Sequence, residues 1–184
     1  MHVDKQLGGW ILGYIALAVL VAALARHNQS PVNVDSPGPA AQWQLARVID
    51  GDTLVLALFR TNLITIRLKD IDAPERGQPY YRESKDYLLS CVSIGRIVAA
   101  TNGLDRYKRT LATIYVDGIN INRRLVEVGL AWDYRRWNDD PEISRLEEFA
   151  RQRRVGLWRD PNPVPPWDYR RRVVKSDPLE ESQR

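Results

Sequence analysis

Apolar residues recur at every second position in three short stretches between Trp43 and Asp72. Because successive side chains of a β-strand point to opposite faces, this period predicts strands with one buried face. Turn signals separate the stretches at Asp50-Gly51 and at residues 60–62, and Gly and Asn tolerate the positive φ of tight hairpins. The pattern therefore predicts a three-stranded antiparallel meander.

The rest of the chain predicts two more long strands, one short strand and three helices. Five short strands with a helix between the third and the fourth are typical of an OB-fold, so we expect an α+β protein built on a five-stranded barrel. Fold alone does not fix function. The expected elements are a helix over about 82–94 ended by Gly95, strands at 96–101 and 109–116, a turn at Asp117-Gly118 into a short strand at 119–121, a helix carrying Leu125 and Val126 that stops at Gly129, and a helix over about 141–154 with Ile143, Leu146 and Phe149 facing inward.

The first 40 residues differ from the remainder. Residues 8–25 carry no charge over eighteen positions, which is the lower limit for crossing a bilayer. An uncleaved N-terminal anchor within residues 1–26, a cleaved signal peptide and a buried core helix are the alternatives, and the first two place the rest of the chain outside the cytoplasm. Residues 27–40 are rich in Pro, Asn and Ser and predict a flexible linker. The membrane is thus an expected partner if the segment is retained.

Composition limits the classes of function. At 184 residues there is room for one domain, expected over 41–160, plus extensions, and the net charge of +4 favours anionic partners such as nucleic acid. The single cysteine, Cys91, excludes an internal disulfide and a multi-cysteine zinc site, and its apolar surroundings predict a buried side chain. The two histidines precede the expected domain, so histidine catalysis is excluded there.

Three polar clusters stand at predicted strand ends: DGDT at 50–53, RLKDIDAPE at 67–75 and DRYKRTLA at 105–112. Taken singly, they are typical of a hairpin turn, a solvated strand end and a charge run. Taken together, they predict a site, because antiparallel pairing sets the start of one strand beside the end of the next and so brings Asp52 to Asp72. Paired carboxylates suit a hard divalent cation, which makes both residues candidate metal ligands.

Cleavage of a phosphodiester requires charge neutralisation, an in-line water and a base for its proton. Arg67 and Arg109 carry permanently charged, fork-shaped groups that suit phosphate oxygens. Glu75 supplies a candidate base beside the metal.

At this point the sequence resembles the staphylococcal-nuclease-like (thermonuclease) family. VIDGDT, RLKDIDAPE, DRYKRTLA, VEVGLAW and GLW occur in the family's order over about residues 42–160. The resemblance implies an OB-fold and a Ca²⁺-dependent phosphodiesterase acting on DNA and RNA. The roles it implies are calcium binding by Asp52, Asp72 and the carbonyl of Ala73, general-base or water-orienting action by Glu75, phosphate gripping by Arg67 and Arg109, and contacts to a terminal phosphate by Arg106 and Tyr107.

Some positions leave alternatives open. The family commonly has glycine where this chain has Lys108. Trp132, Tyr134 and Trp137 lie in the region where the family stacks a base, but packing in the core or at its rim is an equal alternative. Residues 161–184 form a proline-rich arm and charged tail. We expect the arm to run extended along the domain and to be pinned by Trp167.

The resulting hypothesis is a calcium-dependent nuclease, membrane-anchored or exported, with nucleic acid as its substrate and no protein partner implied. Its main rival is a catalytically inactive OB-fold that binds nucleic acid or a protein. A basic membrane-tethered scaffold without a nucleic-acid role explains the charge but leaves the polar clusters unexplained.

Overall fold

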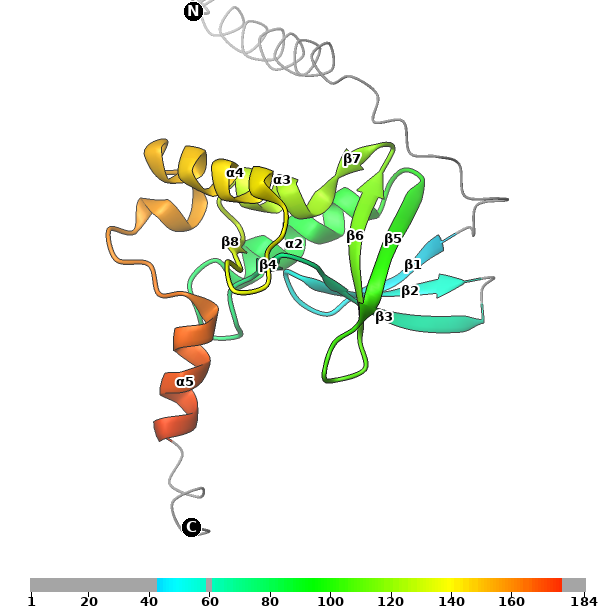
Figure 1. Cartoon of the computed structure of the whole chain (residues 1–184), viewed down its shortest axis with the longest axis horizontal. Helices are drawn as coiled ribbons and strands as arrows, with labels where there is room; N and C mark the ends of the chain where they lie inside the picture. The colour runs from blue at the N-terminus through cyan, green and yellow to red at the C-terminus, as the bar shows by residue number, and fades with distance from the viewer. Residues whose placement is uncertain (1–42, 59–60, 177–184) are drawn as a thin grey trace, which may run out of the picture. The chain divides into compact units, whose positions relative to one another are not determined.

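The computed structural model describes residues 43–58 and 61–176 (Figure 1). Five longer strands form a sheet in the order β3-β2-β1-β5-β6, and the parallel pairing of β3 with β6 closes it into a barrel. The remaining neighbours are antiparallel, which confirms the meander and the OB-fold. The strands are β1 (Trp43–Val48), β2 (Thr53–Leu58), β3 (Asn62–Leu68), β5 (Ile97–Leu104) and β6 (Thr110–Val116), with the short β7 (Ile119–Asn120) added to β6.

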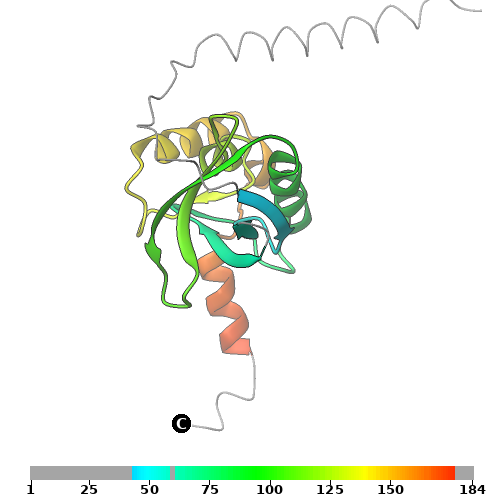
Figure 2. The ribbon, with the colours of Figure 1, turned by 90° about the vertical axis from the view of Figure 1, so that its right-hand side faces the viewer.

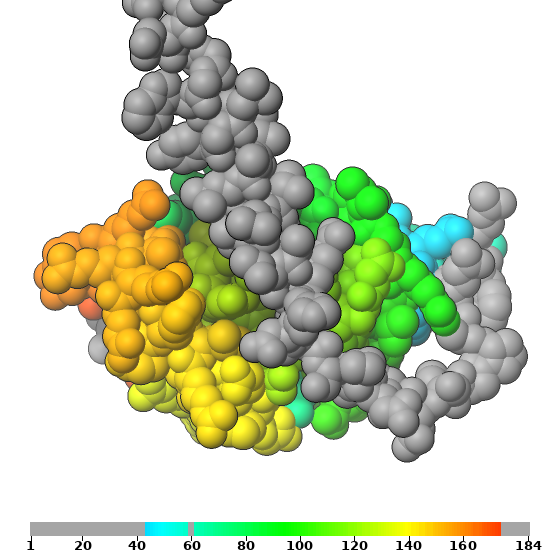
Figure 3. Space-filling view, turned by 90° about the horizontal axis from the view of Figure 1, so that it is seen from above, coloured from blue at the N-terminus to red at the C-terminus, as the bar shows by residue number. Residues whose placement is uncertain are grey.

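Helices lie outside the barrel strands (Figure 2). As predicted, α2 (Tyr81–Val92) is placed between the third and the fourth long strands, and Gly95 follows it in the left-handed region. The others are α3 (Ile121–Glu127), α4 (Pro141–Gln152), the 3-10 helix η1 (Gly156–Arg159) and α5 (Pro166–Ser176). In the space-filling view of Figure 3, the helical part of the chain (yellow to orange) and strands β5 and β6 (green) occupy neighbouring parts of one face.

The main core fills the barrel and the space under α2 and α3. Leu54, Leu56, Ile66, Ile114 and Leu125 are fully buried there. Strand β6 shows the predicted period of two, because its residues 112, 114 and 116 are buried while those between them are only partly so. Cys91 is half-buried and packs against this core, and burial raises the pKa of its thiol.

The inward face of α4 differs from the prediction at one position. Ile143 is buried and Leu146 packs against the core, but Phe149 is 42% exposed. Glu147 takes an inward position instead, since its carboxylate accepts the backbone N–H of Asp133 and ion-pairs with Arg135 and Arg151. A buried charge is tolerated when it is paired in this way.

A second, smaller core lies where β4 (Ile71–Asp72) pairs with β8 (Trp132–Asp133). The ring centroids of Trp132 and Trp158 are 4.4 Å apart, and Trp167 packs against Trp132 with centroids 5.8 Å apart. Trp167 thus pins the C-terminal arm, as predicted. The arm is not extended throughout, however, because α5 begins at Pro166 and is a fourth helix that the sequence reasoning missed.

In the described residues no helix is both long and apolar enough to span a bilayer. The anchor or signal peptide predicted within residues 1–26 and the linker at 27–40 lie outside the described part of the chain.

Candidate active site

Strand pairing brings the two candidate metal ligands together at one end of the barrel. Thr53 at the start of β2 pairs with Arg67 near the end of β3, and Asp52 immediately precedes Thr53. The chain then turns after Leu68, so that the carboxylate of Asp52 accepts the backbone N–H of Ala73 at 2.7 Å. The structure thus places Asp52, Asp72 and Ala73 around one small volume.

Arg67 holds the two aspartates together from inside. Its Nη2 lies 2.8 Å from Oδ1 of Asp72 and 3.1 Å from Oδ2 of Asp52, while its Nη1 donates to the carbonyls of Leu68 and Ile71. With 8% exposure, its guanidinium is fixed by four partners at once. Such a group presents a rigid positive charge beside the carboxylates.

The carboxylate of Asp52 lies close enough to those of Asp50 and Asp72 for its charge to disfavour their ionisation. Burial and then the charge of Asp52 raise the pKa of Asp72 to about 6, against the opposing effect of Arg170 and Arg67. Burial and the charge of Asp52 likewise raise the pKa of Asp50 to about 6. Neighbouring carboxylates in a site that excludes water disfavour the charged form, and a cation bound there would relieve this.

Glu75 lies at the rim of the same cluster. Its side chain is 39% exposed, and its Oε1 accepts a hydrogen bond from Nη1 of Arg170 at 2.5 Å. The Gln78 side chain accepts the backbone N–H of Glu75 and donates to the carbonyl of Val164 in the arm. Glu75 is therefore held beside Asp72 but remains open to solvent, as a group that exchanges protons with water requires.

Arg109 directly precedes β6 and approaches the cluster without contacting the carboxylate of Asp52 or Asp72. Its Nε donates to Asp105 at 2.7 Å, and its Nη1 is 3.5 Å from the Thr53 hydroxyl, which in turn donates to Asp52 at 3.0 Å. Its side chain is 30% exposed. It thus keeps free donor capacity beside the site.

The turn before Arg109 carries the two residues that were predicted to contact a terminal phosphate, Arg106 and Tyr107. Tyr107 is 64% exposed, and Arg106 lies over its ring at 4.8 Å. Lys108 has a φ of 63°, so this position adopts the left-handed conformation that glycine favours. Asp105 stabilises the turn by accepting the backbone N–H groups of Tyr107 and Arg109.

Asp70 does not belong to the site. It is buried at 7% exposure, and Nζ of Lys69 lies 3.7 Å from its Oδ2. The amine of Lys69 lies closer to Asp139, at 2.5 Å.

The donor set is of the kind that calcium prefers. The candidate ligands offer only oxygen, from the carboxylates of Asp52 and Asp72 and the carbonyl of Ala73, and calcium takes six to eight oxygen ligands with water completing the set. In residues 43–58 and 61–176, no three His, Cys, Asp or Glu side chains are arranged as a metal-binding group. The arrangement fits a cation that is held partly by protein and partly by water and substrate.

Of the three aromatic residues that were predicted either to stack a base or to pack, two are packed and one is exposed. Trp132 is buried in the second core, and Tyr134 stacks on Trp167 with centroids 5.5 Å apart. Trp137 is 63% exposed with Arg136 over its ring. Packing explains the first two, and Trp137 alone keeps a free face.

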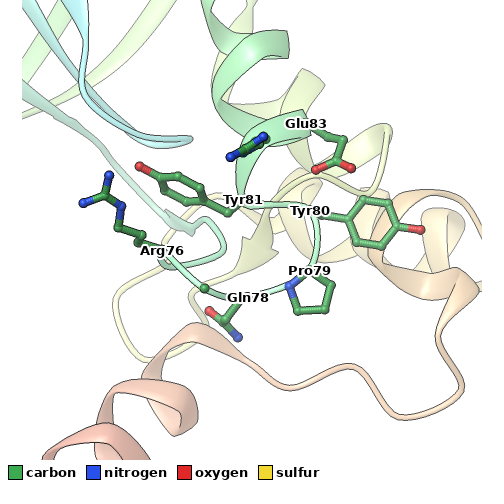
Figure 4. Close-up of a pocket in the computed structure, with 8 residues that line it drawn as sticks. Arg76, Gln78, Pro79, Tyr80, Tyr81 and Glu83 are labelled. Atoms are coloured by element: carbon green, nitrogen blue, oxygen red, sulfur yellow. The ribbon is translucent and has the colours of Figure 1, made fainter.

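A pocket of about 520 Å³ opens in the loop that follows Glu75. Its lining includes two arginines and two tyrosines, and Figure 4 shows Arg76 and Tyr81 extending to one side of the loop while Tyr80 extends to the other. Tyr80 has a φ of 66° and precedes α2 directly. The loop thus continues the positive and aromatic surface away from the cluster.

Sequence reasoning missed Arg170. Its Nη2 lies 2.7 Å from Oδ2 of Asp72, and its Nη1 contacts Glu75. Pro166 at the start of α5 and Asp168 in its first turn are helix-start signals that predict α5, but they do not predict which residues Arg170 contacts.

Comparison with known proteins agrees with this geometry. The family described as staphylococcal nuclease homologue matches residues 65–160. An uncharacterized endonuclease of Escherichia coli is 42% identical over 130 residues, covering 70% of this chain and 84% of the relative. The micrococcal nuclease of Shigella flexneri is 34% identical over 167 residues, covering 85% of this chain and 92% of the relative. A staphylococcal-like nuclease of Arabidopsis thaliana is 39% identical over 159 residues, covering 85% of this chain and 48% of the relative. With barrel, motifs and relatives in agreement, the chain belongs to the staphylococcal nuclease family.

Proposed function

We propose that this member of a nuclease family is a calcium-dependent phosphodiesterase that hydrolyses DNA and RNA at the end of its barrel. The observation that carries the proposal is the shared position of Arg67 between Asp52 and Asp72, with Glu75 at the rim of the same cluster. A surface charge run would not bury an arginine at 8% exposure between two carboxylates.

Asp52, Asp72 and the Ala73 carbonyl would hold the calcium ion, which supplies positive charge against the negative charge that develops on the phosphate. Glu75 accepts the proton of the attacking water, because it is the carboxylate of the cluster that solvent reaches. Arg109 donates to phosphate oxygens, and its forked guanidinium orients the phosphate and stabilises its charge. Arg67 supplies a fixed positive charge beside the phosphate, because its Nη atoms already donate to Asp72, Leu68 and Ile71.

The substrate surface extends to both sides of this centre. Arg106 and Tyr107 on the exposed turn suit a terminal phosphate and its sugar or base. Arg76 and Tyr81, which extend to one side of the loop, suit the neighbouring part of a single strand, since bases stack on tyrosine and phosphates pair with arginine (Figure 4). The nucleic acid is therefore the expected partner of this face.

The proposal extends to cellular location. The uncharged residues 8–25 support an enzyme that is anchored in the membrane with its domain outside the cytoplasm, or secreted if this segment is cleaved.

Degradation of single-stranded DNA and of RNA by the full-length chain, with calcium or with a calcium chelator, tests the activity. We expect cleavage only with calcium, and a loss of about a hundredfold or more in Arg109→Ala, as for removal of a charge-stabilising donor. Arg145→Ala is the matched control, because this arginine of α4 is 80% exposed and pairs only with Glu142 among the described residues. Salt-sensitive binding without cleavage would instead establish the inactive OB-fold module.

A further inference from the structure

We propose that Arg170 is a removable latch, which covers Asp72 and Glu75 and must leave when calcium binds there. The inference rests on the proposed function of this site and adds a control of its metal affinity. It concerns the C-terminal helix α5, which lies beyond the residues that the family comparison matched.

The latch makes a two-pronged contact with the metal-binding carboxylate. Nη2 of Arg170 lies 2.7 Å from Oδ2 of Asp72, and Nη1 lies 3.3 Å from Oδ1 and 2.5 Å from Oε1 of Glu75. Arg67 contacts Oδ1 of Asp72 from the other side. Both oxygens of Asp72 are thus engaged by guanidinium groups.

Charge balance makes calcium compete with this contact. Asp52, Asp72 and Glu75 contribute three negative charges, and Arg67 and Arg170 contribute two positive charges. A dication beside Asp72 would bring the total to one positive charge and would stand within a few ångströms of the Arg170 guanidinium. Like charges at such distances repel, although solvent around the part-exposed Arg170 side chain weakens the repulsion. Calcium therefore displaces the arginine, or the arginine weakens calcium binding.

The helix allows this displacement without disturbing either core. Trp167 anchors α5 one turn before Arg170 by stacking on Tyr134 and packing against Trp132. From there α5 runs outward (Figures 1 and 2), and residues 171–173 are exposed. The side chain of Arg170 is itself 41% exposed, so it can swing into solvent while Trp167 stays in place.

The apparent Kd for calcium equals the intrinsic Kd divided by the fraction of molecules in which the latch is open. A latch that is mostly closed therefore lowers the apparent affinity. Couplings of this kind amount to about fivefold or more. With the latch closed, the cluster carries one net negative charge, and Asp72 stays covered until calcium reaches a concentration that competes with an arginine held on the same chain.

Calorimetric titration of calcium into the full-length protein tests the latch directly. We expect the Kd of Arg170→Gln to be about fivefold or more below that of the wild type, and the Kd of Arg170→Lys to lie between them, because a lysine keeps the charge but loses the fork. Arg172→Gln is the matched control, since Arg172 is exposed on the same helix. Equal unfolding midpoints for the four proteins in the absence of calcium would show that the fold is intact.

Cleavage measured in parallel separates this inference from the proposed function. With the latch, Arg170→Gln reaches half-maximal cleavage at lower calcium and matches the wild type at saturating calcium. An unchanged or weaker calcium affinity in Arg170→Gln would overturn the latch while calcium-dependent cleavage by the wild type left the nuclease standing. A loss of tenfold or more in kcat/KM at saturating calcium would also overturn it and would make Arg170 a substrate-binding residue. Tighter calcium binding without cleavage by any variant would support the latch and refute the nuclease.

Discussion

The Asp52 carboxylate accepts the backbone N–H of Ala73 at 2.7 Å, which ties the start of β2 to the segment that follows β4. The same oxygen of Asp52 lies 3.1 Å from Arg67. One side chain therefore both fixes the path of the segment that we propose to bind calcium and contributes charge to it. These two contributions are separable by substitution.

Asp52→Asn tests the charge while keeping the backbone contact. The amide oxygen can still accept from Ala73, so we expect the fold to be retained. The calcium Kd is expected to rise about tenfold or more, because a hard cation needs the negative ligand charge. Calorimetry and circular dichroism measure the two properties.

Asp50→Asn is the control for this substitution. Asp50 occupies the same turn and accepts the backbone N–H of Asp52 at 3.1 Å, a contact that an asparagine preserves. A calcium affinity equally reduced in both variants, or unchanged in Asp52→Asn, would argue against Asp52 as a ligand.

Glu75→Gln tests the proposed base. Glutamine keeps the shape but accepts no proton, so we expect turnover to fall about a hundredfold or more while the protein stays folded. Single-turnover cleavage of a defined DNA strand at saturating calcium measures the chemical step. Glu148→Gln is the matched control, because Glu148 is exposed on α4 and accepts a hydrogen bond from Gln152 of the same helix. Turnover near that of the wild type in Glu75→Gln would remove Glu75 from the mechanism.

The sequence predicted the barrel well because its signals are local. Alternation of apolar and polar residues along β3 and β6 is a property of each strand alone, and the meander then determines that Asp52 meets Asp72. The buried position of Arg67 follows from its pairing with Thr53, which is also a neighbouring-strand relationship.

Contacts between residues that are far apart in the sequence were not predictable in this way. Arg170 contacts Glu75 from 95 positions away, and the prolines before α5 suggested extended chain although a proline also begins helices. Glu147 turns inward because Arg135 and Arg151 neutralise it, and an apolar period cannot reveal such a pairing. Ion pairs that form only in the folded chain therefore account for the features that the sequence pattern did not predict.

Gly129→Ala tests a close approach between two chain segments. Gly129 has a φ of 70°, and a Cβ there would lie 2.3 Å from the carbonyl oxygen of Val155, which is backbone. We expect a loss of more than about 2 kcal/mol, since both the conformation and the contact oppose a side chain. Urea unfolding measures the loss.

Gly118→Ala separates the two causes. Gly118 has a similar φ of 82°, but a Cβ there would meet nothing within 4 Å, so only conformational strain of about 1 kcal/mol is expected. Equal losses in the two variants would mean that the contact with Val155 is relieved by a small backbone shift.

Asp140 is expected to make stability depend on pH at the acidic end. It is the N-cap of α4, accepting the backbone N–H of Glu142, and it forms a two-pronged pair with Arg123. Burial opposes its ionisation, but the hydrogen bonds from Arg123 and Glu142 outweigh burial and lower its pKa below the usual 3.8. A lowered pKa in the folded state means that the carboxylate stabilises the fold fully above about pH 4 and that this contribution is lost as the pH falls through the folded value.

Asp140→Ala removes both the cap and the pair, and we expect it to cost about 1 to 2 kcal/mol near neutral pH, mostly from the cap because the Arg123 side chain is 42% exposed. Asp140→Asn keeps an acceptor for the cap and is expected to cost less. Urea unfolding of the three proteins from neutral pH to about pH 3 measures both effects. The difference between the wild type and Asp140→Asn is expected to shrink below about pH 4, because protonation of Asp140 removes the charge that asparagine lacks. A difference that stays constant over this range would show that the charge of Asp140 contributes nothing to stability and that only its role as an acceptor matters.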